Sequence, residues 1–328
     1  MKNLDPRSFA LEKIRTTTRE FEWNSGVSDA WTSQLRARLS ECIGIDQLQM
    51  DALQPEIHSE SQEDGFRKLT VTFGSQPGMR VFAYILIPDG TTSPGPAVVC
   101  VPGHGAGVDA LVGTAELDYQ NQFALQFVRQ GLVTLAIEPI SFGHRKSEVD
   151  KDKGSSCLRD SMAALMLGQS MIAWRTWDAI AAFNYLSSRP EVDSNNIGIV
   201  GISGGGLVAF WAACLEPRYA AAVVSGYFNT FFDSIISIEH CSDNFACGLA
   251  KVVEMPDMVA LIAPRKLFVE SGTEDHIFPA EAFKAACQRA EVIYESVGAS
   301  ASFKSELFQG DHVFWGKQAL PQLKTWLS

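Results

Sequence analysis

The sequence predicts an α/β fold in which a mostly parallel central sheet is covered by helices on both faces. Short, fully apolar runs recur after residue 96, and segments of helical length separate them. Unbroken apolar strands that alternate with helices are typical of parallel sheets buried on both sides. The chain has 328 residues, of which 46% are hydrophobic and 20% charged, so it can bury the large core that such a sheet requires.

The first elements expected are helices. Residues 1–65 read as a helical appendage in which a few apolar side chains stand among charges: Trp23, Trp31, Leu35 and Leu39. The stretch Met1 to Arg15 has no uninterrupted apolar run and predicts a polar helix, with no secretory signal. The α/β domain is expected to occupy residues 66–328.

The pattern changes to a period of two from Lys68, where Leu69, Val71 and Phe73 alternate with polar residues. Together with the apolar run Val81 to Ile87, this predicts two strands joined by a turn. Six buried strands are then expected in order: Ala97 to Val101, Val133 to Ile137, Ile197 to Gly201, Ala221 to Val224, Lys266 to Glu270 and Ser305 to Phe308.

One helix between these strands has a clear apolar face, formed by Ala173, Trp177, Ile180 and Ala181.

Two stretches, Lys146 to Gln169 and Phe228 to Pro264, do not fit the simple alternation of strands and helices. Excursions after the carboxyl ends of strands lie over the binding crevice of an α/β sheet, so these stretches are expected to form the pocket wall. Four apolar side chains are the predicted substrate contacts: Phe228, Phe231, Phe232 and Met255.

Charge and cysteine content narrow the class of partner. A formal net charge of -11 disfavours nucleic acid and anionic membrane surfaces, and no apolar stretch approaches the length of a membrane span. Seven scattered cysteines do not form a disulfide framework, which indicates a reducing, cytoplasmic compartment. The expected partner is a small molecule, and the sequence is compatible with a homo-oligomer.

A serine between glycines is the first candidate catalytic residue. Ser203 lies in the sequence Gly-Ile-Ser-Gly-Gly-Gly, which follows an apolar strand and opens the apolar helix Leu207 to Cys214. A strand-to-helix turn this tight exposes a serine hydroxyl, and the amide of Gly204 can donate to an oxyanion. A phosphate-binding turn is disfavoured because the P-loop lysine and the G-x-G-x-x-G spacing are missing.

A serine nucleophile needs a base and an acid that orients the base, in the chain order Ser, acid, His. His312 follows the last predicted strand and is the expected base. Asp275 follows the strand that ends at Glu270 and is the expected acid. Glu274 is the nearest competitor, whereas Asp311 is adjacent in sequence to His312 and poorly placed to reach its ring.

The second oxyanion donor is expected in the glycine-rich loop Pro102 to Gly107, where the amide of His104 is the candidate. A plain tight turn remains an alternative for this loop.

The spacing of His240, Cys241 and Cys247 matches no zinc pattern, so these residues are interpreted as pocket lining. No metal and no cofactor are expected.

With these residues assembled, the chain from Leu69 onward resembles the α/β-hydrolase superfamily, and within it the bacterial dienelactone-hydrolase-like or acetylxylan-esterase-like branch. The resemblance depends mainly on these motifs: Trp177-Asp178-Ala179-Ile180, Arg189-Pro190-Glu191-Val192-Asp193, Ile197 to Gly206, Tyr227-Phe228, Ile262-Ala263-Pro264-Arg265, Gly272 with Asp275 and Pro279, and Gly310 with His312. Such proteins usually carry His-Gly where this chain has Pro102-Gly103. Likewise, Ser141-Phe142-Gly143-His144-Arg145 differs at two positions from their Gly-Phe-Gly-Glu-Arg turn.

The resemblance implies hydrolysis of carboxylic esters through an acyl-enzyme, and it implies the mechanism better than the substrate. Peptidase, amidase or carbon–carbon hydrolase activity with the same triad is the alternative within enzymes. A non-catalytic binding protein on a hydrolase scaffold is the alternative of another class, which the intact set Ser203, Asp275 and His312 disfavours.

Overall fold

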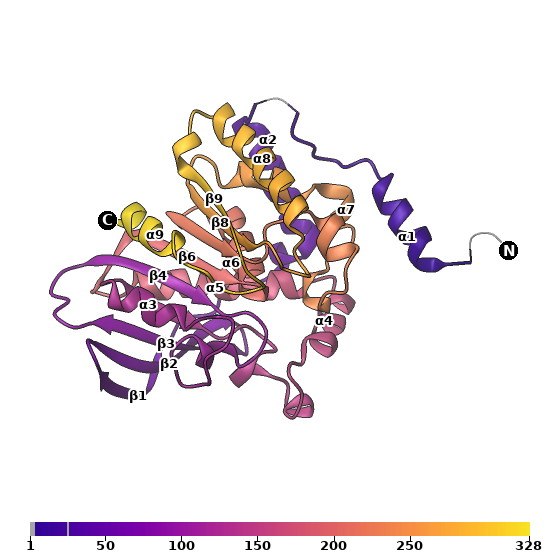
Figure 1. Ribbon diagram of the computed structural model, residues 1–328. Helices are drawn as coiled ribbons and strands as arrows, with labels where there is room; N and C mark the ends of the chain where they lie inside the picture. The colour runs from indigo at the N-terminus through magenta and orange to yellow at the C-terminus, as the bar shows by residue number, and fades with distance from the viewer. Residues whose placement is uncertain (1–3, 25) are drawn as a thin grey trace.

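The computed structural model describes residues 4–24 and 26–328, and one nine-stranded sheet runs through this part of the chain (Figure 1). In spatial order the strands are β1 (Glu56–Glu63), β2 (Phe66–Gln76), β3 (Met79–Pro88), β5 (Val133–Ile137), β4 (Gly95–Val101), β6 (Val192–Ile202), β7 (Ala221–Ser225), β8 (Lys266–Gly272) and β9 (Phe303–Phe308). The first four strands in this order pair antiparallel, and every later pair, from β5–β4 to β8–β9, is parallel. The predicted mostly parallel sheet is confirmed.

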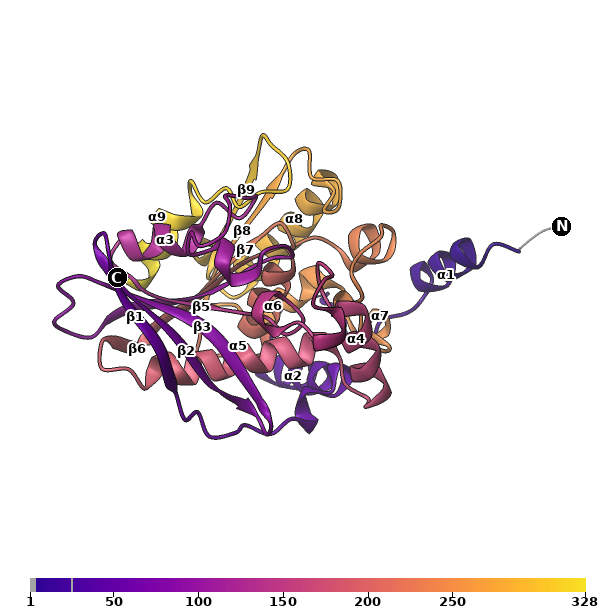
Figure 2. The ribbon, with the colours of Figure 1, turned by 90° about the horizontal axis from the view of Figure 1, so that it is seen from below.

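Helices cover both faces of the sheet. One face packs against α2 (Asp29–Ile43), α5 (Met171–Ser187), α6 (Gly204–Leu215) and α8 (Ala280–Ser296), and the other against α3 (Phe123–Arg129) and α9 (Ala319–Leu327). Figure 2 shows α3 and α9 on one side of the strands and α5 with α2 on the other. Strand β4 serves both cores, since Val99 and Val101 belong to the first and Val98 and Cys100 to the second. This two-sided burial explains its unbroken apolar sequence.

The N-terminal helices differ in how they attach to this body. Helix α1 (Pro6–Arg15) projects away from it and buries none of its side chains (Figures 1 and 2). Helix α2 buries Leu35, Leu39 and Ile43 in the same core as the sheet. The segment between the two helices is held at Trp23, whose carbonyl accepts a hydrogen bond from Arg289 and whose ring lies under that guanidinium.

Strand β1 lies inside the segment that was expected to be helical. It pairs with β2 as the edge strand of the sheet, so the predicted boundary after residue 65 separates two paired strands. Seven of its eight side chains are exposed, and its sequence Glu-Ile-His-Ser-Glu-Ser-Gln-Glu contains a single apolar residue. An exposed, polar edge strand needs no apolar alternation, and charged side chains protect it from pairing with other chains.

Strand β1 lies at the end of the sheet farthest from β8 and β9, which precede the predicted acid and base. The alanine variants Glu56→Ala and His58→Ala are therefore expected to leave kcat on any ester unchanged within about twofold. Glu56 forms an exposed ion pair with Arg80, and His58 contacts Thr72. Steady-state kinetics beside a thermal melt and a sizing column measures this. A large loss of kcat with unchanged melting temperature and oligomeric state would show that this segment contributes to the chemistry.

The two irregular stretches lie together beyond the parallel strands. The first contains α4 (Cys157–Met166), and the second runs from the π-helical turn η5 (Phe231–Ile236) through η6 (Ser242–Asn244), α7 (Leu249–Val252) and η7 (Met255–Leu261). Helix α4 contacts η6 and α5. The remaining short turns are η1 (Ile45–Gln47), η2 (Gly107–Ala110), η3 (Gly143–Arg145), η4 (Glu148–Asp150) and η8 (Ser300–Ser302). Among the described residues, each helix is too short or too polar to cross a bilayer.

Candidate active site

Ser203 occupies the turn between β6 and α6 in a backbone conformation that a side chain rarely adopts, with φ 56° and ψ −121°. Its amide donates to the carbonyl of Ser225 on β7 at 3.0 Å, and its carbonyl accepts from Leu207 in the first turn of α6. A Cβ atom on Gly201 would collide with the backbone of Gly205. The surrounding glycines therefore let the strand and helix approach closely enough to hold the serine in this turn.

His312 and Asp275 meet at the carboxyl edge of the sheet, because they follow the parallel neighbours β9 and β8. Nδ1 of His312 lies 2.6 Å from Oδ2 of Asp275. The other carboxylate oxygen of Asp275 accepts the amides of Ile277 and Phe278, each at 3.0 Å, and only 6% of the residue is exposed. The carboxylate is thus fixed from its own loop and holds the imidazole at Nδ1.

The imidazole of His312 lies beside two aromatic rings: Tyr119, with 5.6 Å between centroids and 28° between the ring planes, and Phe278, with 5.7 Å and 16°. Its Nε2 atom is buried and has no hydrogen-bond partner among the described residues. His312 and Ser203 line the same pocket. A hydroxyl and an unpartnered imidazole nitrogen at one pocket can support nucleophilic catalysis with general-base assistance.

The two competing carboxylates face elsewhere. Glu274 is exposed and accepts a hydrogen bond from the side chain of Gln309. Asp311 is exposed, and its carboxylate accepts the backbone amide of His312 at 2.8 Å rather than a ring nitrogen. Of the three predicted candidates, the structure brings only Asp275 to the imidazole.

The glycine-rich loop after β4 lies directly against Ser203. A Cβ atom on Gly103 would lie 3.0 Å from the Cβ of Ser203, so only glycine lets this backbone come so close. The Gly103 amide donates to Gln120 at 2.8 Å, and the His104 carbonyl accepts the Tyr119 hydroxyl at 2.6 Å. Tyr119 and Gln120, which no sequence motif indicates, therefore fix the loop that carries the predicted second oxyanion donor.

Glu138 fastens this loop to the next one. Its two carboxylate oxygens accept the amides of Val108 at 3.1 Å and His144 at 3.2 Å. Burial raises the pKa of Glu138 to about 7, although both amides lower it. The turn from Ser141 to Arg145, whose role the sequence left open, is thereby tied through Glu138 to the loop that contains His104.

The pocket around Ser203 has a volume of about 360 Å³. It is lined by His104, Tyr119, Ser203, Gly204, Tyr227, Glu239, His240, Cys241, Asn244, Ile277, Phe278 and His312. None of the four predicted substrate contacts is among them. Phe228 and Met255 are fully buried, Phe228 against the ring of Phe210, and Phe232 is half-buried away from the pocket.

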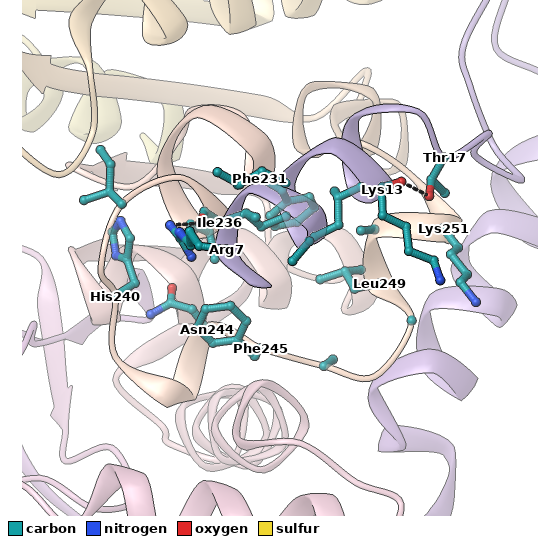
Figure 3. A pocket seen from close by; sticks show the side chains of 18 of the residues that line it. Arg7, Lys13, Thr17, Phe231, Ile236, His240, Asn244, Phe245, Leu249 and Lys251 are labelled. Atoms are coloured by element: carbon teal, nitrogen blue, oxygen red, sulfur yellow. Dashed lines mark hydrogen bonds between the residues drawn. The ribbon is translucent and has the colours of Figure 1, made fainter. Parts of the chain in front are cut away.

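The fourth predicted contact, Phe231, lines a second and larger cavity of about 600 Å³ between α1 and the segment from η5 to α7 (Figure 3). Arg7 of α1 donates to the carbonyl of Ile236 across this cavity at 2.6 Å. His240 and Asn244 line both cavities, so the two adjoin at the second irregular stretch. The π-helical turn η5 thus directs the ring of Phe231 toward α1 and away from Ser203.

The three residues weighed as metal ligands do not form a group. Cys247 is exposed, and His240 contacts Ser234 and the carbonyl of Ile277. Cys241 instead lies with three other side chains behind the His104 loop: His104, Cys157 and Asp243. These four side chains form one compact group, with the buried guanidinium of Arg175 beside it.

Fold and site together define an α/β-hydrolase, with a serine on the strand-to-helix turn and a histidine–aspartate pair at the carboxyl edge of the sheet. Residues 10–307 match the model of the family described as "Abhydrolase family", and the chain belongs to this family. The Bacillus subtilis (strain 168) protein named "Putative hydrolase YtaP" is 28% identical over 231 residues, 68% of this chain and 74% of that protein.

Solved structures share the fold over nearly the whole chain. The crystal structure of "a putative acetyl xylan esterase" from Bacteroides fragilis NCTC 9343 has a TM-score of 0.83 at 18% identity and covers 98% of this chain and 95% of its own. A glucuronoyl esterase from Solibacter usitatus has a TM-score of 0.67 at 14% identity, with 95% and 99% covered. Acetyl xylan esterase 1 from Thermoanaerobacterium sp. JW/SL YS485 has a TM-score of 0.61 at 16% identity, with 97% and 99% covered. The predicted α/β-hydrolase fold is confirmed.

Proposed function

We infer that the protein is a serine esterase that hydrolyses carboxylic esters through an acyl-enzyme on Ser203. The observation that carries this proposal is that Ser203, on its strained turn, lines one pocket with an imidazole whose far nitrogen is held by Asp275. A serine hydroxyl becomes nucleophilic only when a base accepts its proton, and the base must be held in the right tautomer.

In the proposed reaction, Nε2 of His312 takes the proton of Ser203 as Oγ attacks the ester carbonyl carbon. The amides of Gly204 and His104 stabilise the negative charge that develops on the carbonyl oxygen. The proton then passes from His312 to the departing alcohol, and the C–O bond breaks. In the second half, His312 takes a proton from water, the hydroxide attacks the acyl carbon, and Ser203 leaves with that proton.

The pocket lining supports a short acyl group on a polar alcohol. Ile277 and Phe278 supply apolar surface near His312, while Glu239, His240 and Asn244 place charged and polar groups on the same wall. Two of the structural neighbours are, by name, an acetyl xylan esterase and a glucuronoyl esterase. We therefore favour small esters of sugars, such as acetylated xylose, over long-chain esters.

Labelling with a fluorophosphonate followed by kinetics on matched substrates tests this proposal. We expect stoichiometric labelling at Ser203 and a kcat/KM for p-nitrophenyl acetate at least about tenfold above that for the octanoate, since a small pocket excludes extra methylenes. The matched control is p-nitroacetanilide, which has the same acyl group on an amide. Faster cleavage of the anilide would indicate an amidase or peptidase, and no labelling at all would indicate a non-catalytic binding protein.

A further inference from the structure

Four potential metal ligands converge behind the loop that carries His104. They are His104, Cys157, Cys241 and Asp243, and their ligand atoms all lie within 4.8 Å of one another. Asp243 is 0% exposed and Cys157 is 1% exposed. The four side chains come from the oxyanion loop, the start of α4, and the segment at η6, so tertiary folding and not local sequence brings them together.

Three of the distances between these atoms are close to the edges of a tetrahedron around one ion, and Sγ of Cys241 lies within 4.8 Å of the other three ligand atoms. Nε2 of His104 lies 3.0 Å from Oδ2 of Asp243 and 3.8 Å from Sγ of Cys157, and this sulfur lies 3.5 Å from the same Asp243 oxygen. A tetrahedral zinc ion with bonds of about 2.0 Å to nitrogen and oxygen and about 2.3 Å to sulfur separates its ligand atoms by about 3.3 to 3.8 Å. Small side-chain adjustments therefore suffice to close the site.

The surroundings supply what a buried zinc site requires. Arg175 is fully buried, donates to Oδ2 of Asp243 at 2.5 Å, and reaches Sγ of Cys157 at 3.2 Å. Asn244 donates to the other oxygen of Asp243 at 2.8 Å. Such outer hydrogen bonds orient metal ligands. Two thiolates and one carboxylate carry three negative charges, which Zn²⁺ and the Arg175 guanidinium balance.

We propose that His104, Cys157, Cys241 and Asp243 bind one zinc ion in a closed tetrahedral site. Four protein ligands leave no open position for water or substrate, so the ion's role is structural. Bound there, it joins both irregular stretches to the loop whose His104 amide is the proposed oxyanion donor. The alternative without a metal is an ion pair of Asp243 with Arg175 to which His104 and Cys157 are hydrogen-bonded, and the metal titration distinguishes the two.

Cobalt substitution tests the site without relying on enzyme activity. Full-length protein is stripped with a chelator, kept reduced under anaerobic conditions, and titrated with Co²⁺. We expect saturation at about one ion per chain, a thiolate-to-cobalt charge-transfer band in the near ultraviolet, and strong visible bands typical of tetrahedral cobalt. Added Zn²⁺ should remove these bands and raise the melting temperature of the protein.

The variants Cys157→Ser and Cys241→Ser are expected to lower zinc content in the purified protein at least about tenfold and to lose the charge-transfer band. Cys247→Ser is the matched control, because Cys247 is an exposed cysteine near Cys241 in sequence and outside the cluster. It should bind zinc as the wild type does. The wild-type titration needs no variant, so misfolding of a variant does not obscure the result.

Weak bands typical of octahedral cobalt, zinc binding that survives Cys241→Ser, or a reduced protein that binds neither ion would each overturn the zinc site. A disulfide between Cys157 and Cys241 that forms in air, with no metal bound after reduction, would also overturn it. None of these outcomes depends on ester hydrolysis, so they leave the proposed esterase activity to its own test.

Discussion

Replacing Ser203 or His312 with alanine is expected to lower kcat for the best ester by about 10⁴-fold or more, because the nucleophile and its base act as a unit. Ser203→Ala removes the only atom that forms the acyl bond in the proposed reaction. His312→Ala removes the proposed acceptor of its proton, whereas the neighbouring aromatic rings of Tyr119 and Phe278 remain. Single-turnover and steady-state kinetics on p-nitrophenyl acetate measure both losses.

His276→Ala is the matched control for the histidine variant. His276 is an exposed histidine next to Asp275 in sequence, and it does not line the pocket around Ser203. Its replacement should leave kcat within about twofold of the wild type. Retention of more than a few per cent of activity by Ser203→Ala or His312→Ala, in protein with a normal melting temperature, would remove that residue from the proposed mechanism.

The buried sheet is the part of the fold that the sequence predicts most accurately. Val133–Ile137 is observed with the predicted bounds, and the predicted strand from Lys266 extends by two residues to Gly272. A short apolar run between helical segments strongly favours a buried strand, because each of its side chains faces one of the two cores. Strand β1 was missed for the opposite reason: an exposed edge strand buries no apolar face and leaves no periodic pattern.

Pocket lining could not be predicted from sequence in the same way. The stretch after β7 has no single period, so nothing in it indicates which side chains face Ser203. The π-helical turn η5 decides this by directing Phe231 toward α1, while Phe278 comes to the pocket from the loop after β8. Tyr119 is a comparable case. It fixes the His104 loop, but it lies in a loop that matches no motif.

The cluster behind His104 shows a different limit. Cys157, Cys241 and Asp243 lie in the two irregular stretches, and no spacing within either stretch resembles a zinc motif. The only signal in the sequence is that each residue belongs to a segment expected over the carboxyl edge of the sheet. That placement predicts a shared neighbourhood, yet it does not predict contact, which depends on how α4 packs against η6.

Asp275→Asn is expected to lower kcat by about 10³ to 10⁴-fold, with folding preserved. Nδ1 of His312 lies 2.6 Å from Oδ2 of Asp275, and a carboxylate, which can only accept, favours the tautomer with the proton on Nδ1 and the lone pair on Nε2. An asparagine amide can instead donate to Nδ1 and so stabilise the tautomer with the proton on Nε2, which cannot accept the proton of Ser203. The oxygen of asparagine can still accept the amides of Ile277 and Phe278, so the loop should keep its shape.

Two neighbouring carboxylates provide matched controls for this variant. Glu274→Gln changes an exposed side chain that contacts Gln309, and Asp311→Asn changes one that accepts only the backbone amide of His312. Each should cost less than about tenfold in kcat, since neither touches the imidazole. The three variants are compared by kcat at constant pH, together with their melting temperatures. If Glu274→Gln were more damaging than Asp275→Asn in folded protein, the orienting role would pass to Glu274 in spite of the contact observed for Asp275.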